Sequence, residues 1–405
     1  MSALIHGVGC SLIDYLYTDI DFGSPRVQAY RSSSPGDGGL EPGKLVFADR
    51  FAAFAGEHYL DALARITEGR DPAWENLGGP AVVALVHAAQ MFERAGEAVR
   101  FYGLRGNDSI GERIMHFLDR TSLDIGHYHV TEGVSPFTYV LSDPNYAEGQ
   151  GERMFINNIG AAYEMVPGRI PEAFFEAPIL LYGGTALVPN LHGRLDEALE
   201  RGRASGALNV VTTVYDFYNQ SRDPKGRWPI GRSERSYPNI DLLITDLEEA
   251  RRLSGAEDPA TALDFFGEAG VGAAIITHGN NDVHLFAAED SRFAPLPHTA
   301  MPVSARVASE LAAGAGANGD TTGCGDNFCG GVLYALAEQY RSSRRAGEAD
   351  APERYDLVEA LRWGIVSGGF ACFYVGGTYF EDHPDQKRSA LLPYYEAYLE
   401  QGAGS

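Results

Sequence analysis

Short apolar runs alternate with amphipathic stretches through the second half of the chain. The apolar runs read APILLYGG, LNVVTTVYD, IDLLITD and GVGAAIITHGN, and helical spacing follows in LDEALERGRAS, LEEARRLSG and NFCGGVLYALAEQY. Alternation of strands and helices is typical of a mostly parallel sheet with helices on both faces. The pattern therefore predicts an α/β fold.

Two segments break this alternation. The chain from about 127 to 160 alternates apolar and polar positions, with Pro and Gly between the runs, which predicts antiparallel strands of a small accessory sheet. Residues 22–49 are rich in Ser, Pro and Gly and predict a long irregular excursion. A polar segment, SSRRAGEADAPERYD, indicates a loop between two late helices.

Polar residues follow several of the predicted strands. They are Asp14, Asp216, Asp246, His278 and Asn280. In a mostly parallel sheet, ligands bind beyond the carboxyl ends of the strands. We therefore expect these side chains to share one crevice.

Composition narrows the classes of partner. The 405 residues carry 32 basic and 55 acidic side chains, a net charge of −23, so binding to nucleic acid or to an anionic membrane is not expected as a main role. The N-terminus lacks a basic region, and no segment has the roughly 18 consecutive apolar residues of a membrane span, which predicts a cytoplasmic protein. The cysteines, Cys10, Cys324, Cys329 and Cys372, lack zinc-type spacing and suit a reducing compartment.

The stretch GANGDTTGCGDNFCGG, from Gly316 to Gly331, leads from a glycine-rich loop into a helix that we expect to begin near Asp326. Consecutive backbone amides in such a turn bind anions, and the helix adds its positive end. Gly323, Cys324 and Gly325 would hold the negative charge that develops on a phosphoryl group, and Asp326 would accept a proton from the attacking hydroxyl. The simpler alternative is that Asp326 caps the helix and the glycines only turn the chain.

The string DTTGCGDNFCGG resembles, almost letter for letter, the C-terminal signature of the ribokinase-like (PfkB) carbohydrate kinase family. The resemblance implies a three-layer α/β/α fold with a small β-sheet lid. It also implies one kinase domain over residues 1–405, with lid elements at about 15–50 and 127–160. The implied activity is transfer of the γ-phosphoryl group of ATP, with Mg²⁺, to a hydroxyl of a sugar, polyol or nucleoside. A homodimer and K⁺ as a second cation are further candidates.

Other segments follow the same family order. Gly7, Gly9 and Asp14 resemble its first strand, whose aspartate holds sugar hydroxyls, and Gly78 and Gly79 resemble the pair that opens the substrate-side helix. The segments LRGNDSIGERI and YDFYNQSRDPKGRW resemble two more motifs, the second with altered spacing.

The metal and nucleotide ends of the site come from two further segments. TDLEEARRLSG resembles the Asn-x-x-Glu motif, so Glu249 and Asp246 would support Mg²⁺. IITHGNND resembles the turn that meets the nucleotide, which implies binding by Thr277, Gly279 and Asn280.

The chain also departs from the family pattern. Val83 stands near the place of an asparagine that contacts sugar hydroxyls, and Asp246 replaces the asparagine of the metal motif, although a carboxylate can still serve Mg²⁺. Asp320 and Thr322 match positions used for a monovalent cation, but the late loop VGGTYFEDHP is too divergent to complete that site.

Several residues have two interpretations. Asp14 and Asp108 are either functional or turn and capping carboxylates, and Cys324 is either reactive or a small filler of the turn. Two rival functions also remain. One is a ligand-binding regulator on a kinase fold. The other, suggested by GVGCSL after the first strand, is a dinucleotide-dependent oxidoreductase, although Leu12 occupies the place of the third glycine.

Overall fold

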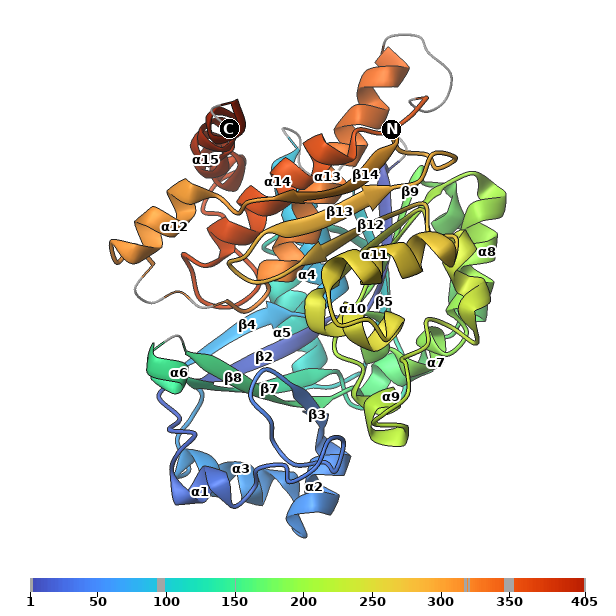
Figure 1. The fold of residues 1–405 in the computed structure, drawn as a ribbon. Helices are drawn as coiled ribbons and strands as arrows, with labels where there is room; N and C mark the ends of the chain where they lie inside the picture. Colours follow the sequence, from blue (N-terminus) through green and yellow to red (C-terminus); the bar gives the residue numbers. More distant parts are fainter. Residues whose placement is uncertain are drawn as a thin grey trace.

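The computed structural model describes residues 3–92, 99–149, 151–316, 319, 321–345 and 353–403. It contains a large sheet with strand order β14-β13-β12-β11-β10-β9-β1-β5-β6 and a small sheet with order β3-β8-β7-β2-β4 (Figure 1). The strands of the large sheet are β1 (Ile5–Gly9), β5 (Val99–Arg105), β6 (Asp124–Val130), β9 (Ile179–Gly183), β10 (Leu208–Thr212), β11 (Leu242–Asp246), β12 (Ala273–Thr277), β13 (Val283–Ala287) and β14 (Leu296–Met301).

Pairing in the large sheet is parallel from β12 through β6, and β13 and β14 add an antiparallel edge. Every residue of β1, β9 and β10 is buried. Continuous apolar runs of this kind belong to strands that are covered on both faces. The predicted mostly parallel sheet is confirmed.

Helices cover both faces of the large sheet (Figure 1). One layer contains α4, α13 and α14, and the other contains α8, α10 and α11. The longer helices are α4 (Pro80–Met91), α5 (Ser109–Leu118), α8 (Leu195–Ser205), α10 (Leu247–Ser254), α11 (Pro259–Glu268), α12 (Ala305–Ala312), α13 (Cys324–Arg345), α14 (Leu357–Ala371) and α15 (Gln386–Ala403). Short helices are α6 (Tyr146–Gly149), α7 (Pro189–His192) and α9 (Phe217–Arg222). Helix α13 packs between α14 and α4, so the glycine-rich loop opens onto the middle of one helical layer.

The small sheet consists of β2 (Leu12–Tyr17), β3 (Leu45–Phe47), β4 (Trp74–Gly78), β7 (Phe137–Asp143) and β8 (Glu152–Asn158). Its pairings are mixed, since β2 and β7 are parallel while β7 and β8 are antiparallel. Helices α1 (Pro25–Gln28), α2 (Ala48–Ala55) and α3 (Tyr59–Thr67) lie on the side of this sheet that faces away from the large sheet (Figure 1). The excursion at 22–49 is therefore part of a packed layer, and its Phe22, Val27 and Leu40 are buried.

Two strands differ from their predicted place. The small sheet was expected from about residue 127, but β6 pairs in parallel with β5 at the edge of the large sheet, and the small sheet resumes at Phe137. As an edge strand, β6 has one buried residue, Tyr128, so its sequence carries no periodic signal that assigns it to the large sheet.

The first strand ends at a glycine, Gly9. Asp14 was expected directly after a strand, but the chain enters the small sheet at Leu12, so Asp14 lies within β2.

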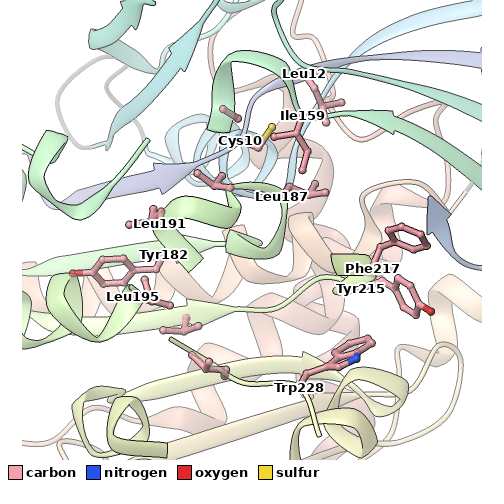
Figure 2. Close-up of a cluster of buried hydrophobic side chains, with 14 of the residues drawn as sticks. Cys10, Leu12, Ile159, Tyr182, Leu187, Leu191, Leu195, Tyr215, Phe217 and Trp228 are labelled. Carbon is pink, nitrogen blue, oxygen red and sulfur yellow. The ribbon is translucent and has the colours of Figure 1, made fainter. Parts of the chain in front are cut away.

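A continuous group of apolar side chains joins the two sheets. Figure 2 shows Cys10 and Leu12, where the chain passes between the sheets, together with Leu187, Leu191 and Tyr182 around β9. In the same view Tyr215 lies beside Trp228, and their rings meet edge to face with centroids 5.1 Å apart. This packing fixes the small sheet against the carboxyl ends of the central strands. In the part of the chain that the structure describes, no helix is long and apolar enough to cross a membrane.

Candidate active site

The glycine-rich loop turns sharply into α13. Gly323 has φ +74°, and a Cβ atom there would lie 2.5 Å from Cα of Gly377. Among the described residues the backbone amides of Gly323 and Gly325 have no acceptor, whereas the amide of Cys324 donates to the Thr321 carbonyl at 3.3 Å. A Cβ at Gly325 would meet no atom within 4 Å, so this turn faces open space. Open amides at the start of a helix form a site for an anion.

Asp326 is the third residue of α13, so it lies beyond the N-cap position, which Gly323 occupies. Desolvation raises the pKa of the Asp326 carboxyl to about 7. A carboxyl group with this pKa exchanges a proton readily at neutral pH, which is the property required of a general base.

Asp14 lies against the glycine pair. Strand β2 runs antiparallel to β4, with Leu12 opposite Gly78. A Cβ at Gly78 would lie 2.0 Å from Oδ2 of Asp14, and one at Gly79, which has φ +106°, would lie 2.5 Å from the Cys10 carbonyl oxygen. Only glycine leaves room for the carboxylate and for the opening turn of α4.

The loop at 374–379 joins this pair to the anion site. Nδ2 of Asn76 donates to the Val375 and Thr378 carbonyls at 2.9 and 3.2 Å, and Oγ1 of Thr378 donates to the Leu77 carbonyl at 2.7 Å. Gly377 of the same loop lies against Gly323. The structure thus brings together the predicted acceptor residues and the predicted anion site. Sequence reasoning treated this loop only as divergent, although its two adjacent glycines were a signal of close backbone approach.

Two carboxylates lie together at the end of β11. Oδ1 of Asp246 accepts from the Glu249 amide at 2.7 Å, and the Glu249 carboxylate accepts from the Thr213 hydroxyl. Desolvation and the nearby Asp246 charge raise the pKa of Glu249 well above its usual range, and desolvation also raises the pKa of Asp246. Two carboxyl groups whose ionisation is opposed in this way are stabilised by a cation. A pair of carboxylates suits a largely hydrated ion such as Mg²⁺. Within the described ranges no group of three or more His, Cys, Asp and Glu side chains could hold a metal.

The predicted nucleotide residues lie beside these carboxylates. Thr277 is paired with Asp246 in the register of β12 and β11, and Gly279 has φ +56° in the turn that follows. Asn280 is exposed in that turn. His278 is exposed as well, and its proximity opposes the rise in the pKa of Asp246.

The small sheet contacts residues beside both the anion site and the pair of carboxylates. The sequence did not indicate the two residues that make these contacts, Arg153 and Lys44. Nη1 of Arg153, on β8, donates to Oγ1 of Thr322 at 2.7 Å, directly before the anion site. Nζ of Lys44 lies 3.4 Å from Oε1 of Glu248, next to Glu249. No local motif marks either residue, because each partner is distant in the sequence.

A profile of the pfkB family carbohydrate kinases matches residues 76–384. The chain belongs to the pfkB family of carbohydrate kinases. Adenosine kinase from Sinorhizobium meliloti has a similar structure, with a TM-score of 0.68 and 17% identity over 96% of this chain and 100% of that chain. Adenosine kinase from Schistosoma mansoni, in complex with 2-fluoroadenosine, has a TM-score of 0.69 and 14% identity over 94% of this chain and 98% of that chain. Ribokinase from Thermotoga maritima has a TM-score of 0.57 and 17% identity over 98% of this chain and 99% of that chain. The fold is ribokinase-like, and family membership supports a sugar or nucleoside kinase.

Two other predicted carboxylates have structural roles. Asp108 caps α5, where its oxygens accept from the amides of Gly111 and Ser135 at 2.7 and 2.8 Å, and these bonds lower its pKa. Asp216 caps α9 and lies 3.4 Å from the His192 ring nitrogen. Both carboxylates thus accept hydrogen bonds from the backbone of this pfkB protein and stabilise its local structure.

The first glycines do not form a dinucleotide fingerprint. A Cβ at Gly7 would lie 2.6 Å from a methyl of Leu85, and one at Gly9 would lie 2.5 Å from Cβ of Ala81, so both glycines allow α4 to pack closely. The chain continues from β1 into β2 and not into a helix. The strand-turn-helix context of that motif is absent here, and the oxidoreductase alternative is wrong.

The side chains of Val83 and Cys324 both pack against neighbouring segments of the pfkB fold. Val83 is buried, and its methyls lie against Gly377, so it supplies an apolar contact where the family pattern has an amide. Sγ of Cys324 lies 3.4 Å from Sγ of Cys372, at the end of α14, so this side chain is directed towards the helical layer. Asp320, named above for a monovalent cation, lies outside the described residues, and Thr322 bonds to Arg153.

Proposed function

We propose that this pfkB protein is an ATP-dependent kinase that transfers the γ-phosphoryl group to a hydroxyl of a sugar, polyol or nucleoside. The observation that carries the proposal is Asp326, a carboxyl with a pKa of about 7 in the same helical turn as the amides of Gly323 and Gly325, which have no acceptor among the residues that the structure describes. A base and an anion site on one turn suit attack of a hydroxyl on phosphorus. The adenosine kinases and the ribokinase among the structural neighbours support this class of acceptor.

In this proposal Asp14, Gly78 and Gly79 hold the acceptor. The Asp14 carboxylate accepts hydrogen bonds from acceptor hydroxyls, and Gly78 leaves it the space to do so. Asp326 removes the proton from the attacking hydroxyl as the oxygen approaches phosphorus. The backbone amides of Gly323 and Gly325 stabilise the charge on the transferred group, and the Cys324 amide joins them once it leaves the Thr321 carbonyl.

Thr277, Gly279 and Asn280 hold the nucleotide in the turn after β12. Their position next to Asp246 and Glu249 fits a nucleotide whose phosphates share Mg²⁺ with these carboxylates. Bound Mg²⁺ would neutralise charge on the phosphate oxygens. The protein's own part is to orient the two carboxylates, through the Glu249 amide and the Thr213 hydroxyl, and these two hydrogen bonds oppose the desolvation that raises the pKa of both groups.

The small sheet acts as the lid in this proposal. Arg153 brings a guanidinium to Thr322, at the mouth of the anion site, and Lys44 reaches Glu248 beside the metal carboxylates. A lid that contacts both ends excludes water, which would otherwise accept the phosphoryl group.

The test is release of ADP from ATP and Mg²⁺ in the presence of single sugars, polyols and nucleosides, with acceptor-free ATPase as the baseline. We expect one acceptor class to raise ADP release far above that baseline and to give a phosphorylated product by mass spectrometry. If no acceptor does so while acceptors still bind by calorimetry, the protein is a ligand-binding regulator on a kinase fold.

A further inference from the structure

Asn327, the residue after Asp326, joins the two loops that form the site. It is completely buried in the first turn of α13. Its Nδ2 donates to the Gly323 carbonyl at 2.9 Å and to the Gly377 carbonyl at 2.8 Å. One side-chain amide thus fixes both Gly323, which opens the anion site, and the loop at 374–379, which is bonded to Asn76 of β4.

The other end of this amide accepts three hydrogen bonds. Oδ1 of Asn327 accepts hydrogen bonds from Nζ of Lys387 at 2.9 Å, from Nδ1 of His87 at 2.9 Å and from the Tyr374 hydroxyl at 3.1 Å. Because Oδ1 can only accept, His87 carries its proton on Nδ1, and its buried Nε2 has no partner in the described part of the chain. Donors at one end and carbonyls at the other permit a single orientation of the Asn327 amide.

Lys387 is the charged donor of the three. It is 1% exposed in the first turn of α15, and its backbone amide donates to Oε1 of Glu381 at 2.8 Å. Its ammonium lies 5.8 Å from the ring centroids of both Tyr374 and Tyr379. Removing an ammonium group from water costs several kcal/mol. A lysine at this depth requires a reason beyond general stability.

We propose that Lys387 is a positioning residue for phosphoryl transfer, since its ammonium holds Asn327 in the orientation that ties Gly323 to Gly377. The inference rests on the proposed kinase function and extends it. Without Lys387, the bonds from His87 and Tyr374 alone hold Oδ1, and the amide is less firmly fixed. Gly323 then has more freedom to leave its left-handed conformation, and the amides of the anion site lose their common direction.

Lys387→Met tests the proposal, because Met has a similar length and no donor. We expect kcat to fall by about 10²-fold, the loss that misplacement by about 1 Å can cause. The KM values of ATP and acceptor should change far less, since Lys387 is buried and not exposed to a ligand. Lys225→Met, in an exposed turn, is the matched control and should behave as the wild type.

The pH profile gives a readout that a packing role would not change. Burial lowers the pKa of Lys387 to about 7, with Glu381 opposing the shift. The titratable groups that face it are His87 from α4 and Glu381, Tyr374 and Tyr379 from the loop before α15. The wild-type kcat should decline as Lys387 loses its proton above neutral pH, and this alkaline decline should be absent in Lys387→Met.

Chemical rescue decides the case even if Lys387→Met does not fold. Lys387→Ala leaves a space lined by Asn327, Tyr374 and Tyr379 that suits methylammonium, so the added amine should restore turnover. Restoration by methylammonium but not by the neutral amide acetamide supports the proposal. A folded Lys387→Met with wild-type kcat and alkaline decline overturns it, and so does Lys387→Ala that methylammonium does not change. If the proposed kinase function is wrong, the wild type itself phosphorylates no acceptor, and this outcome differs from an active wild type whose Lys387 variants behave normally.

Discussion

At the scale of single residues, the site depends on missing side chains as much as on charged ones. Gly78 is the clearest case, because the position of its absent Cβ lies 2.0 Å from a carboxylate oxygen of Asp14. The two residues therefore act as a pair, in which the glycine makes the room that the aspartate uses.

Gly78→Ala should raise the KM of the acceptor by at least about tenfold, because the new methyl displaces the Asp14 carboxylate. The KM of ATP should stay near its wild-type value. Steady-state kinetics with each substrate varied in turn makes the comparison, and Gly168→Ala, where a Cβ meets no atom within 4 Å, is the matched control. An equal rise in both KM values would mean that Gly78 serves only the fold.

Glu249→Gln should raise the Mg²⁺ concentration needed for half-maximal activity, since a charge that attracts the hydrated ion is lost. The raised pKa of Glu249 adds a pH dependence with a definite sign. A proton competes with the ion, so the wild-type Mg²⁺ requirement should increase as the pH falls. Titrations between pH 6 and 8, with exposed Glu257→Gln as the control, test both points. A Mg²⁺ titration that Glu249→Gln leaves unchanged would remove Glu249 from the metal site.

Gly323, Cys324, Gly325 and Asp326 could be proposed from the sequence, because the glycine-rich turn and the string that resembles the family signature occupy a few adjacent positions. Arg153 and Lys387 could not be predicted in this way. Their partners, Thr322 and Asn327, are 169 and 60 positions away, and only the folded chain brings them together.

At the scale of elements, the small sheet connects the two ends of the site. Strand β8 contributes Arg153 to the anion loop, and the residue before β3, Lys44, reaches α10. Helices α1–α3 support the far face of this sheet, so the sheet has a packed layer behind it.

Arg153→Met should lower kcat by about tenfold or more, because the bond to Thr322 and a positive charge beside the transferred group are both lost. It should also increase the share of ATP that is hydrolysed without acceptor, since the lid excludes water less well. The ratio of phosphorylated product to ADP measures this share, with exposed Arg169→Met as the control. An unchanged ratio and an unchanged kcat would show that β8 has no part in the reaction.

The order of strands and helices was readable from apolar periodicity in the central elements, where burial on both faces leaves few alternatives. It failed at β6, and although it placed the end of the first strand at its glycines, it did not predict β2. Strand β6 has a single buried position, whereas β7 is mostly buried, so the edge strand carries little periodic signal that would assign it to the large sheet. Cys10 and Ser11, which connect the two sheets, are buried, so no exposed position marks the passage of the chain into a second sheet.

At the scale of the whole molecule, Asp326 links activity to stability. The pKa of this carboxyl rises from 3.8 in the unfolded chain to about 7 in the folded protein. A group of this kind contributes stability below pH 3.8, and the contribution is lost as the pH rises through 7.

Asp326→Asn should therefore melt at a higher temperature than the wild type at pH 8, and the difference should shrink towards pH 4. Thermal unfolding followed by circular dichroism at both pH values tests this expectation. A variant that is less stable than the wild type at pH 8 would show that Asp326 supports the fold in its ionised form.

The most direct test of the whole account is kcat of Asp326→Asn. Asparagine preserves the size of the side chain and leaves the amides of Gly323 and Gly325 in place, but it cannot accept the hydroxyl proton. We expect kcat to fall by about 10²- to 10⁴-fold, while calorimetry still detects binding of ATP and acceptor with near wild-type affinity. A variant that binds both ligands and turns over within a few-fold of the wild type would contradict the assignment of Asp326 as the base.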